Sequence, residues 1–208
     1  MPTPLARPLH RFRPLVRAQK LIVRPHSAQQ SIRRHYPLFQ SPSEEWVNGL
    51  THAAAALMSL VASVWLVWAA ARQGDLLMIL GCAAYSASLT AVFAMSTLSH
   101  LVETPRLRLL FRTLDQAAIF LLTAGSCTPY FIRYLLLDGW AWLLPLLWGL
   151  ALLCAWDKLR GHRVNSVSLL PYVVLGWFPI LAFKPMLLAM PTGCLLLVIA
   201  SGGCYMLG

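Results

Sequence analysis

Five polar side chains suited to metal binding or acid–base catalysis lie in or beside strongly apolar stretches of this chain. They are Asn48, His52, Ser96, His100 and Asp115. Asn48 and His52 are four residues apart, as are Ser96 and His100, so each pair would share one face of a helix. Imidazole and carboxylate groups bind zinc and also transfer protons in enzymes. Because polar groups are expensive inside a membrane, these five are candidates for a functional site.

Each of these side chains also has an ordinary structural explanation. Asp115 can favour the positive end of its helix or pair with Arg112. His52 can hydrogen-bond a neighbouring helix, and Ser96 can bond to the carbonyl one turn earlier. His100 can lie among lipid headgroups. One imidazole and one carboxylate are a fragment of a metal or acid–base site, so the residues alone leave both a shared pocket and separate structural roles open.

The composition indicates that lipid is the solvent of this chain. Of its 208 residues, 58% are hydrophobic and 12% are charged, and the mean hydropathy is +0.64. A soluble domain carries about 25% charged residues. The net charge of +10 would suit nucleic acid, but eight of the seventeen basic residues lie in the first 34 positions and most others in short loops. That distribution is typical of a membrane protein and argues against a nucleic-acid partner.

The five cysteines all lie in apolar stretches and form no Cys-x-x-Cys pair. We interpret them as small buried hydrophobic residues rather than as disulfides or metal ligands. They are Cys82, Cys127, Cys154, Cys194 and Cys204.

Residues 1–43 differ from the rest of the chain. They contain no acidic residue, many Arg and Pro, and no sustained apolar period. This composition predicts a basic, disordered N-terminal arm. An organelle transit peptide and a translated upstream stretch without a role are the alternatives, whereas a secretory signal is excluded because there is no central apolar run.

Residues 44–208 are predicted to form an all-α, polytopic transmembrane bundle. About 20 apolar residues cross the ~30 Å of hydrocarbon in a membrane, and without alternation at period two the spans must be helices. Pro145, Pro171 and Pro179 are expected to kink the fourth and fifth spans. The six predicted spans are about 47–71, 76–101, 114–137, 139–156, 167–183 and 186–207.

The basic residues predict how this bundle is oriented. Fourteen lie in the N-terminal arm and in the second and fourth connections, against Arg72, Arg133 and Lys184 in the others. Because basic loops stay inside, the N-terminus is predicted to be cytosolic, in a plasma (inner) membrane. All five candidate site residues then lie toward the cytosolic face, a clustering that independent accidents would not produce.

Four motifs, in order over about four fifths of the chain, resemble the hemolysin III family, bacterial-type relatives of the progestin and adiponectin receptors. The first is EEWVNGLTH at residues 44–52, and the second is Ser-x-x-x-His at Ser96 and His100. The third is LDQAAIF at 114–120 followed by GSCTPY at 125–130, and the last is SGGCYMLG at 201–208.

This resemblance implies seven spans, an internal N-terminus and a zinc ion near the cytosolic face. The family holds zinc with one His of the second span and with His-x-x-x-His of the seventh. Carried over by motif, His100 is the zinc ligand, and Ser96 and Asp115 hold or activate a zinc-bound water. The wider superfamily includes alkaline ceramidases, so the implied chemistry is hydrolysis of a lipid amide. Zinc suits this chemistry because it acidifies bound water, and a nearby carboxylate can move the proton.

The chain departs from the family at three places. No histidine follows His162, so the seventh-span ligand pair is absent and six of seven expected spans are present. Ser99 and Gln116 stand where bacterial members commonly have Tyr and His. We expect a fragment or truncated gene model, the alternative being a degenerate member without metal.

Two functions therefore remain open from the sequence. One is a zinc-dependent hydrolase of a lipid amide in incomplete form. The other is a non-catalytic receptor-like, membrane-homeostasis or cytolytic protein without bound metal. The coding sequence after Gly208 discriminates between them, because an in-frame His-x-x-x-His in an apolar run would complete the metal site.

The predicted orientation can be tested by chemical labelling. Single cysteines introduced at Arg72, Gly139 and Lys184 should react with an impermeant maleimide added to intact cells, and one at Arg160 should not. The physical reason is the excess of basic residues on the Arg160 side. The reverse labelling pattern would overturn the orientation.

Overall fold

The structure is a computed structural model that describes residues 42–136, 139–161 and 169–207. The chain divides into two compact units, Met1–Pro42 and Ser43–Gly208, and the account below concerns the second. The predicted basic arm therefore lies almost entirely outside the described residues. Every element within them is helical, which confirms the all-α fold class.

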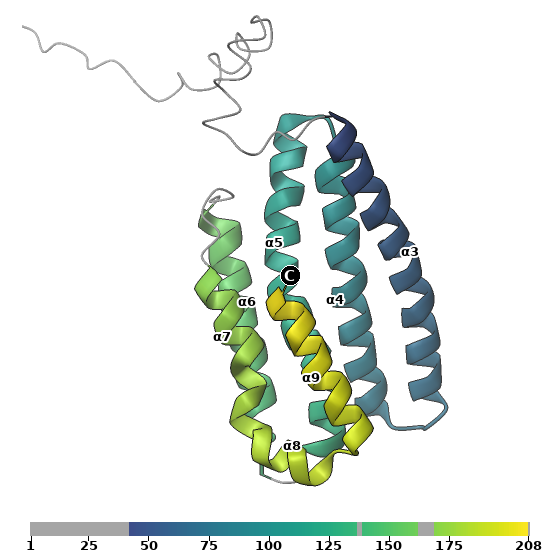
Figure 1. The fold of residues 1–208 in the computed structure, drawn as a ribbon, viewed down its shortest axis with the longest axis vertical. Coiled ribbons are helices and arrows are strands. Elements are labelled where there is room, and N and C mark those ends of the chain that lie inside the picture. Colours follow the sequence, from purple (N-terminus) through teal and green to yellow (C-terminus); the bar gives the residue numbers. More distant parts are fainter. Residues whose placement is uncertain (1–41, 137–138, 162–168, 208) are drawn as a thin grey trace, which may run out of the picture. The chain divides into compact units, whose positions relative to one another are not determined.

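Within the described residues, six helical segments follow one another (Figure 1). The fifth segment joins two α-helices through a short 3₁₀ turn, and each of the others is a single α-helix. The elements are α3 (Pro42–Ala71), α4 (Leu76–Leu101), α5 (Pro105–Tyr134), α6 (Leu143–Gly161), α7 (Leu169–Trp177), η1 (Phe178–Ala182), α8 (Phe183–Ala189) and α9 (Thr192–Leu207).

Short connections make the first three helices antiparallel neighbours. Gly74 has φ +73°, a left-handed conformation that glycine adopts without strain, in the turn between α3 and α4. Asp75 then caps α4, since its Oδ1 accepts hydrogen bonds from the backbone N–H of Leu77 at 3.0 Å and Met78 at 3.3 Å. Pro105 occupies the start of α5, where no helical N–H partner is lost. Two ends of the bundle result, which we name the Glu45 end (start of α3, end of α4, start of α5) and the Gly74 end.

Several helices are long and apolar enough to cross a membrane. Three segments qualify by length and composition alone, namely Ser43–Ala71, Leu76–Leu101 and Leu169–Ala189. Helices α5 and α6, of 30 and 19 residues, carry charged residues near their ends, and α9 is a shorter apolar helix of 16 residues. The chain is thus a polytopic helical membrane protein.

Exposed tryptophans beside arginines mark both ends of the bundle. The Arg72 guanidinium lies 5.1 Å from the ring centroid of Trp68 at the end of α3. The Arg160 guanidinium lies 4.4 Å from the ring centroid of Trp156 near the end of α6. Both indoles are about half exposed. Paired in this way, Trp and Arg suit the interface between hydrocarbon and headgroups.

The break between the last two segments differs from the predicted one. The sequence places it at residues 184–185, whereas the helix runs on through α8 and breaks at Met190 and Pro191, before α9. Pro185 is the third residue of α8, and in the first turn of a helix a missing N–H costs no helical bond. Lys184, expected in a connection, is therefore part of α8.

The prolines expected to kink the fourth and fifth spans mostly occupy helix starts. Pro145 and Pro171 are the third residues of α6 and α7, where proline is tolerated. Pro179 lies in η1, where the helix changes from α to 3₁₀ geometry. A proline inside a long helix is Pro129 of α5.

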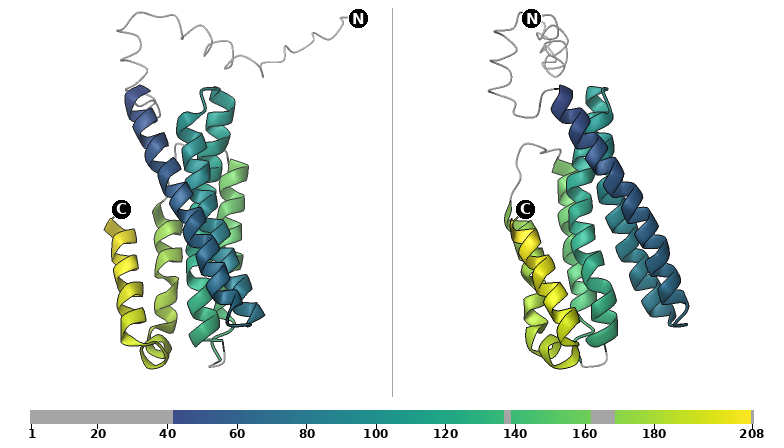
Figure 2. Two further views of the ribbon diagram at one scale, coloured as in Figure 1. Left: turned by 90° about the vertical axis from the view of Figure 1, so that its right-hand side faces the viewer. Right: turned by 45° about the vertical axis from the view of Figure 1, so that its right-hand side comes forward.

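Helix α5 is central, with α4 packed on one side and α6 and α7 on the other (Figures 1 and 2). Small residues let the helices approach closely: a Cβ added to Gly125 would lie 3.3 Å from the Tyr85 Cα of α4 and closer still to the Ser88 hydroxyl. On the opposite side, Phe131 of α5 and Leu147 of α6 belong to one buried apolar cluster.

Helix α3 presents two chemically different faces. Its inner face is buried and built from small residues, including Gly49, Ser59, Ser63 and Ala70. Its outer face exposes large apolar side chains such as Trp65, as expected for contact with lipid. A Cβ added to Gly49 would meet the Leu101 side chain, so α3 lies directly against the end of α4.

The close approach of α4 and α5 predicts the effect of one substitution. Gly125→Leu should destabilise the bundle by about 1–3 kcal/mol, because the larger side chain overlaps Ser88 and the α4 backbone. Thermal unfolding in detergent micelles would measure the change. Gly149→Leu in α6 is the matched control, since a Cβ there meets no atom within 4 Å. Equal effects of both substitutions would contradict the packing argument.

Candidate functional site

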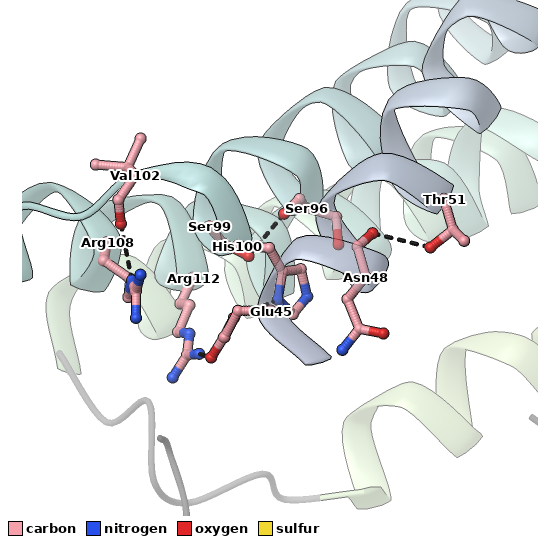
Figure 3. Close-up of polar contacts among 9 residues, drawn as sticks. All are labelled: Glu45, Asn48, Thr51, Ser96, Ser99, His100, Val102, Arg108 and Arg112. Carbon is pink, nitrogen blue, oxygen red and sulfur yellow. Dashed lines mark hydrogen bonds and ion pairs between the residues drawn. The ribbon is translucent and has the colours of Figure 1, made fainter. Parts of the chain in front are cut away.

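The candidate site lies at the Glu45 end of the bundle, where three helices converge. Its centre is Glu45, a residue of the first turn of α3 that is only 5% exposed. A buried carboxylate needs partners for both of its oxygens, because burial of an uncompensated charge is costly. Figure 3 shows these partners arriving from α4 and α5.

Glu45 binds one group from each of the other two helices (Figure 3). Its Oε2 lies 2.7 Å from Nδ1 of His100, in the last turn of α4. Its Oε1 accepts a hydrogen bond from the Arg112 guanidinium of α5 at 3.0 Å. One carboxylate thus links α3, α4 and α5.

The connection before Arg112 is itself held in place. The Arg108 Nε donates a hydrogen bond of 2.8 Å to the carbonyl of Val102, the residue that ends α4. This bond ties the first turn of α5 to the end of α4 (Figure 3). Arg112, one helical turn later, is thereby directed toward Glu45.

The contact with Glu45 bears on which nitrogen of His100 carries a proton. An ionised carboxylate can only accept hydrogen bonds, so the bond at 2.7 Å requires the proton to be on Nδ1. The Arg112 guanidinium on the other oxygen supplies the positive charge that partners this carboxylate. In the neutral imidazole, Nε2 then keeps its lone pair.

The second histidine of the sequence pattern lies against the first. The rings of His52 and His100 are stacked, with centroids 5.6 Å apart and planes within 3° of parallel. The ring of Phe93 on α4 lies 6.3 Å from His52 on a tilted plane. His52 is half-buried, on the α3 face that also carries Glu45 and Gly49.

Asp115 of α5 completes the polar group. Its carboxylate interacts with the hydroxyl of the buried Ser96 and lies near the imidazoles of His52 and His100. The neighbouring Ser99 hydroxyl donates a hydrogen bond of 2.8 Å to the Ser96 carbonyl. A carboxylate, a hydroxyl and two imidazoles therefore lie at one depth of the bundle.

The structure brings together four of the five residues singled out from the sequence: His52, Ser96, His100 and Asp115. Asn48 lies on the same helix face and is half-buried, and its carbonyl accepts a hydrogen bond of 2.9 Å from the Thr51 hydroxyl. The catalytic and metal-binding roles of these residues stay predictions.

Sequence reasoning missed Glu45 as a site residue and paired Arg112 with Asp115 as one alternative. The structure shows Arg112 paired with Glu45. A signal was present, because Glu45 precedes His52 by seven residues, two helical turns on one face.

The described residues fit one ligand position of a zinc ion. His100 presents Nε2 while Glu45 anchors Nδ1, as carboxylates commonly do for metal-binding histidines. Across residues 42–136, 139–161 and 169–207, no group of three His, Cys, Asp or Glu side chains is arranged to hold a metal.

Comparison with known proteins finds a matching family model and similar proteins. A family model described as "Haemolysin-III related" matches residues 40–208. The chain is 32% identical over 171 residues to "Hemolysin-3" of Bacillus cereus, covering 81% of this chain and 78% of the relative. It is 30% identical over 166 residues to "Hemolysin-3 homolog" of Bacillus subtilis (strain 168), covering 79% and 78%. No solved structure matches the chain.

The ion pair at the centre of the site predicts non-additive effects on stability. Arg112→Leu should cost about 3 kcal/mol, because it leaves the Glu45 carboxylate buried without its cation. Combining it with Glu45→Gln should recover most of that loss, since no buried charge remains. Thermal unfolding of the single and double variants would give the coupling. Arg106→Leu, at an exposed position of the same helix, is the control, and strictly additive losses would contradict the pairing.

Proposed function

The chain belongs to the haemolysin-III-related family of membrane proteins, and on that premise we propose that its Glu45 end is a zinc-dependent site for hydrolysis of a lipid amide. The single observation that carries the proposal is the meeting of His100, Ser96 and Asp115 at one place in an otherwise apolar bundle. Ion-pair networks that only hold helices together do not need this second carboxylate. Membrane lipids are the source of substrate.

We also propose that the Glu45 end and the N-terminus face the cytosol, in the plasma (inner) membrane. The support is the distribution of basic residues over the two ends of the bundle. Those near the Glu45 end are Arg106, Arg108, Arg112, Lys158 and Arg160, whereas Arg72, Arg133 and Lys184 lie near the Gly74 end.

In this proposal each side chain has a distinct task. Glu45 orients His100 so that Nε2 can bind zinc, and the remaining protein ligands come from outside the described residues. Zinc, when bound, would acidify a water molecule and polarise the amide carbonyl. Asp115 accepts the proton of the attacking water and returns it to the amine as the carbon–nitrogen bond breaks. Ser96 holds the Asp115 carboxylate in position.

A cytolytic protein without bound metal is the second candidate. What favours it is the name of both relatives, "Hemolysin-3" and "Hemolysin-3 homolog". The two candidates differ in one requirement: hydrolysis needs the Asp115 carboxylate for proton transfer, and membrane permeabilisation does not.

Zinc content and hydrolysis test the proposal together. The 208-residue chain should purify with little zinc, because its described residues offer one oriented imidazole. A version extended by an apolar span bearing His-x-x-x-His should retain about one zinc per chain. In that version His100→Ala should lose most of the metal. Asp115→Asn should keep the metal and slow release of fatty acid from ceramide vesicles by about 10²–10⁴-fold.

Elemental analysis and product release are the two measurements, and dye leakage from the same vesicles is the control for lysis. Equal zinc binding by the extended protein with His100 replaced would contradict the ligand assignment. Leakage that persists in Asp115→Asn, without any hydrolysis by the parent protein, would favour the cytolytic candidate.

A further inference from the structure

We propose that Glu45 is a positioning residue, which holds His100 in the Nδ1–H tautomer and so keeps Nε2 as the lone-pair nitrogen of the site. The use of that lone pair rests on the proposed function, because it is the atom that would bind zinc. The tautomer does not rest on the proposed function, because the contacts of Glu45 with His100 and Arg112 are enough to set it.

The burial of Glu45 is the first support. The side chain is 7% exposed, and both of its oxygens are engaged, one by His100 and one by Arg112. Charge-assisted hydrogen bonds of this kind are about twice as strong as neutral ones and are correspondingly directional. The orientation of the His100 ring is therefore determined by a group on another helix.

The origin of each group is the second support. Glu45 stands 55 residues before His100 and 67 before Arg112 in the chain, so neither contact arises from helical spacing. Helix α3 already packs on α4 through Gly49 and Leu101. An ion pair with Arg112 alone would satisfy one oxygen and link α3 to α5. The bond to His100 is additional, and its specific consequence is the choice of tautomer.

The surroundings of His100 give the third support. The groups that face it are Glu45, the stacked ring of His52, and the Asp115 carboxylate paired with Ser96. The two carboxylates come from different helices, α3 and α5. Because Glu45 takes Nδ1, Nε2 is the nitrogen left for chemistry. In metal sites and in proton-transfer sites, histidines are commonly oriented in the same way, by a hydrogen bond at one ring nitrogen that leaves the other for chemistry.

Nitrogen NMR of the full chain in lipid nanodiscs tests this directly. The protein is labelled with ¹⁵N-histidine and treated with chelator, and His100 is assigned by the signal lost in His100→Gln. The ¹⁵N shifts of the two ring nitrogens, recorded at alkaline pH, distinguish a nitrogen that carries a proton from one that keeps its lone pair. We expect the proton of His100 on Nδ1 in the parent protein and a shift of the population toward Nε2–H in Glu45→Ala. No activity or metal enters this measurement.

Two further variants make the result decisive. Glu103→Ala removes an exposed acid near the same end of the bundle and should leave the tautomer unchanged. Glu45→Gln keeps an oxygen that can accept from Nδ1 but removes the charge, so the Nδ1–H proton should move upfield while the tautomer is retained. If Glu45→Ala does not fold, the Glu45→Gln proton shift decides.

The outcomes separate this inference from the proposed function. An Nε2–H or doubly protonated His100 in the parent protein, an unchanged tautomer in Glu45→Ala, or an unshifted Nδ1 proton in Glu45→Gln each overturns the positioning role. A protein that shows the expected tautomers but hydrolyses no lipid amide would contradict the proposed function alone.

Discussion

The arrangement of the first three helices depends on the need to satisfy one buried carboxylate. Glu45 lies in an apolar bundle, where an ionised group without partners would be strongly unfavourable. Its two oxygens require a donor from α4 and a cation from α5, which His100 and Arg112 supply. The start of α3, the end of α4 and the start of α5 must therefore meet at one point. That meeting point is also where every other polar group of the candidate site is found.

Close packing of small residues makes this meeting possible. Gly49 lets α3 approach the end of α4, and Gly125 lets α4 approach α5 along their length. In lipid, such contacts replace the hydrophobic effect as the source of helix association, since the solvent is as apolar as the side chains. The polar network specifies which ends of the helices coincide, whereas the small residues determine how near they come.

Not all of the polar groups at this end are required for stability. Glu45, His100 and Arg112 satisfy one another, and a bundle held by these three would need neither Asp115 nor Ser96. A second carboxylate, Asp115, taken out of water in the same apolar bundle adds a desolvation cost, which a purely structural arrangement would avoid. Groups retained at such a cost in membrane proteins commonly take part in binding or proton transfer. This difference separates the site from an ordinary interhelical ion pair.

The sequence by itself determined the helical membrane fold, because apolar stretches bounded by charges have one way to satisfy their backbone in lipid. It also determined that His52, Ser96, His100 and Asp115 lie near one end, since antiparallel spans return to the same depth. Only the tertiary structure decided the partner of Arg112, the role of Glu45 and the helix break at Pro191 rather than Pro185. Helical spacing states which face a residue occupies but not which helix covers that face. A partner 55 residues away in the chain is chosen by packing and by the cost of a buried charge.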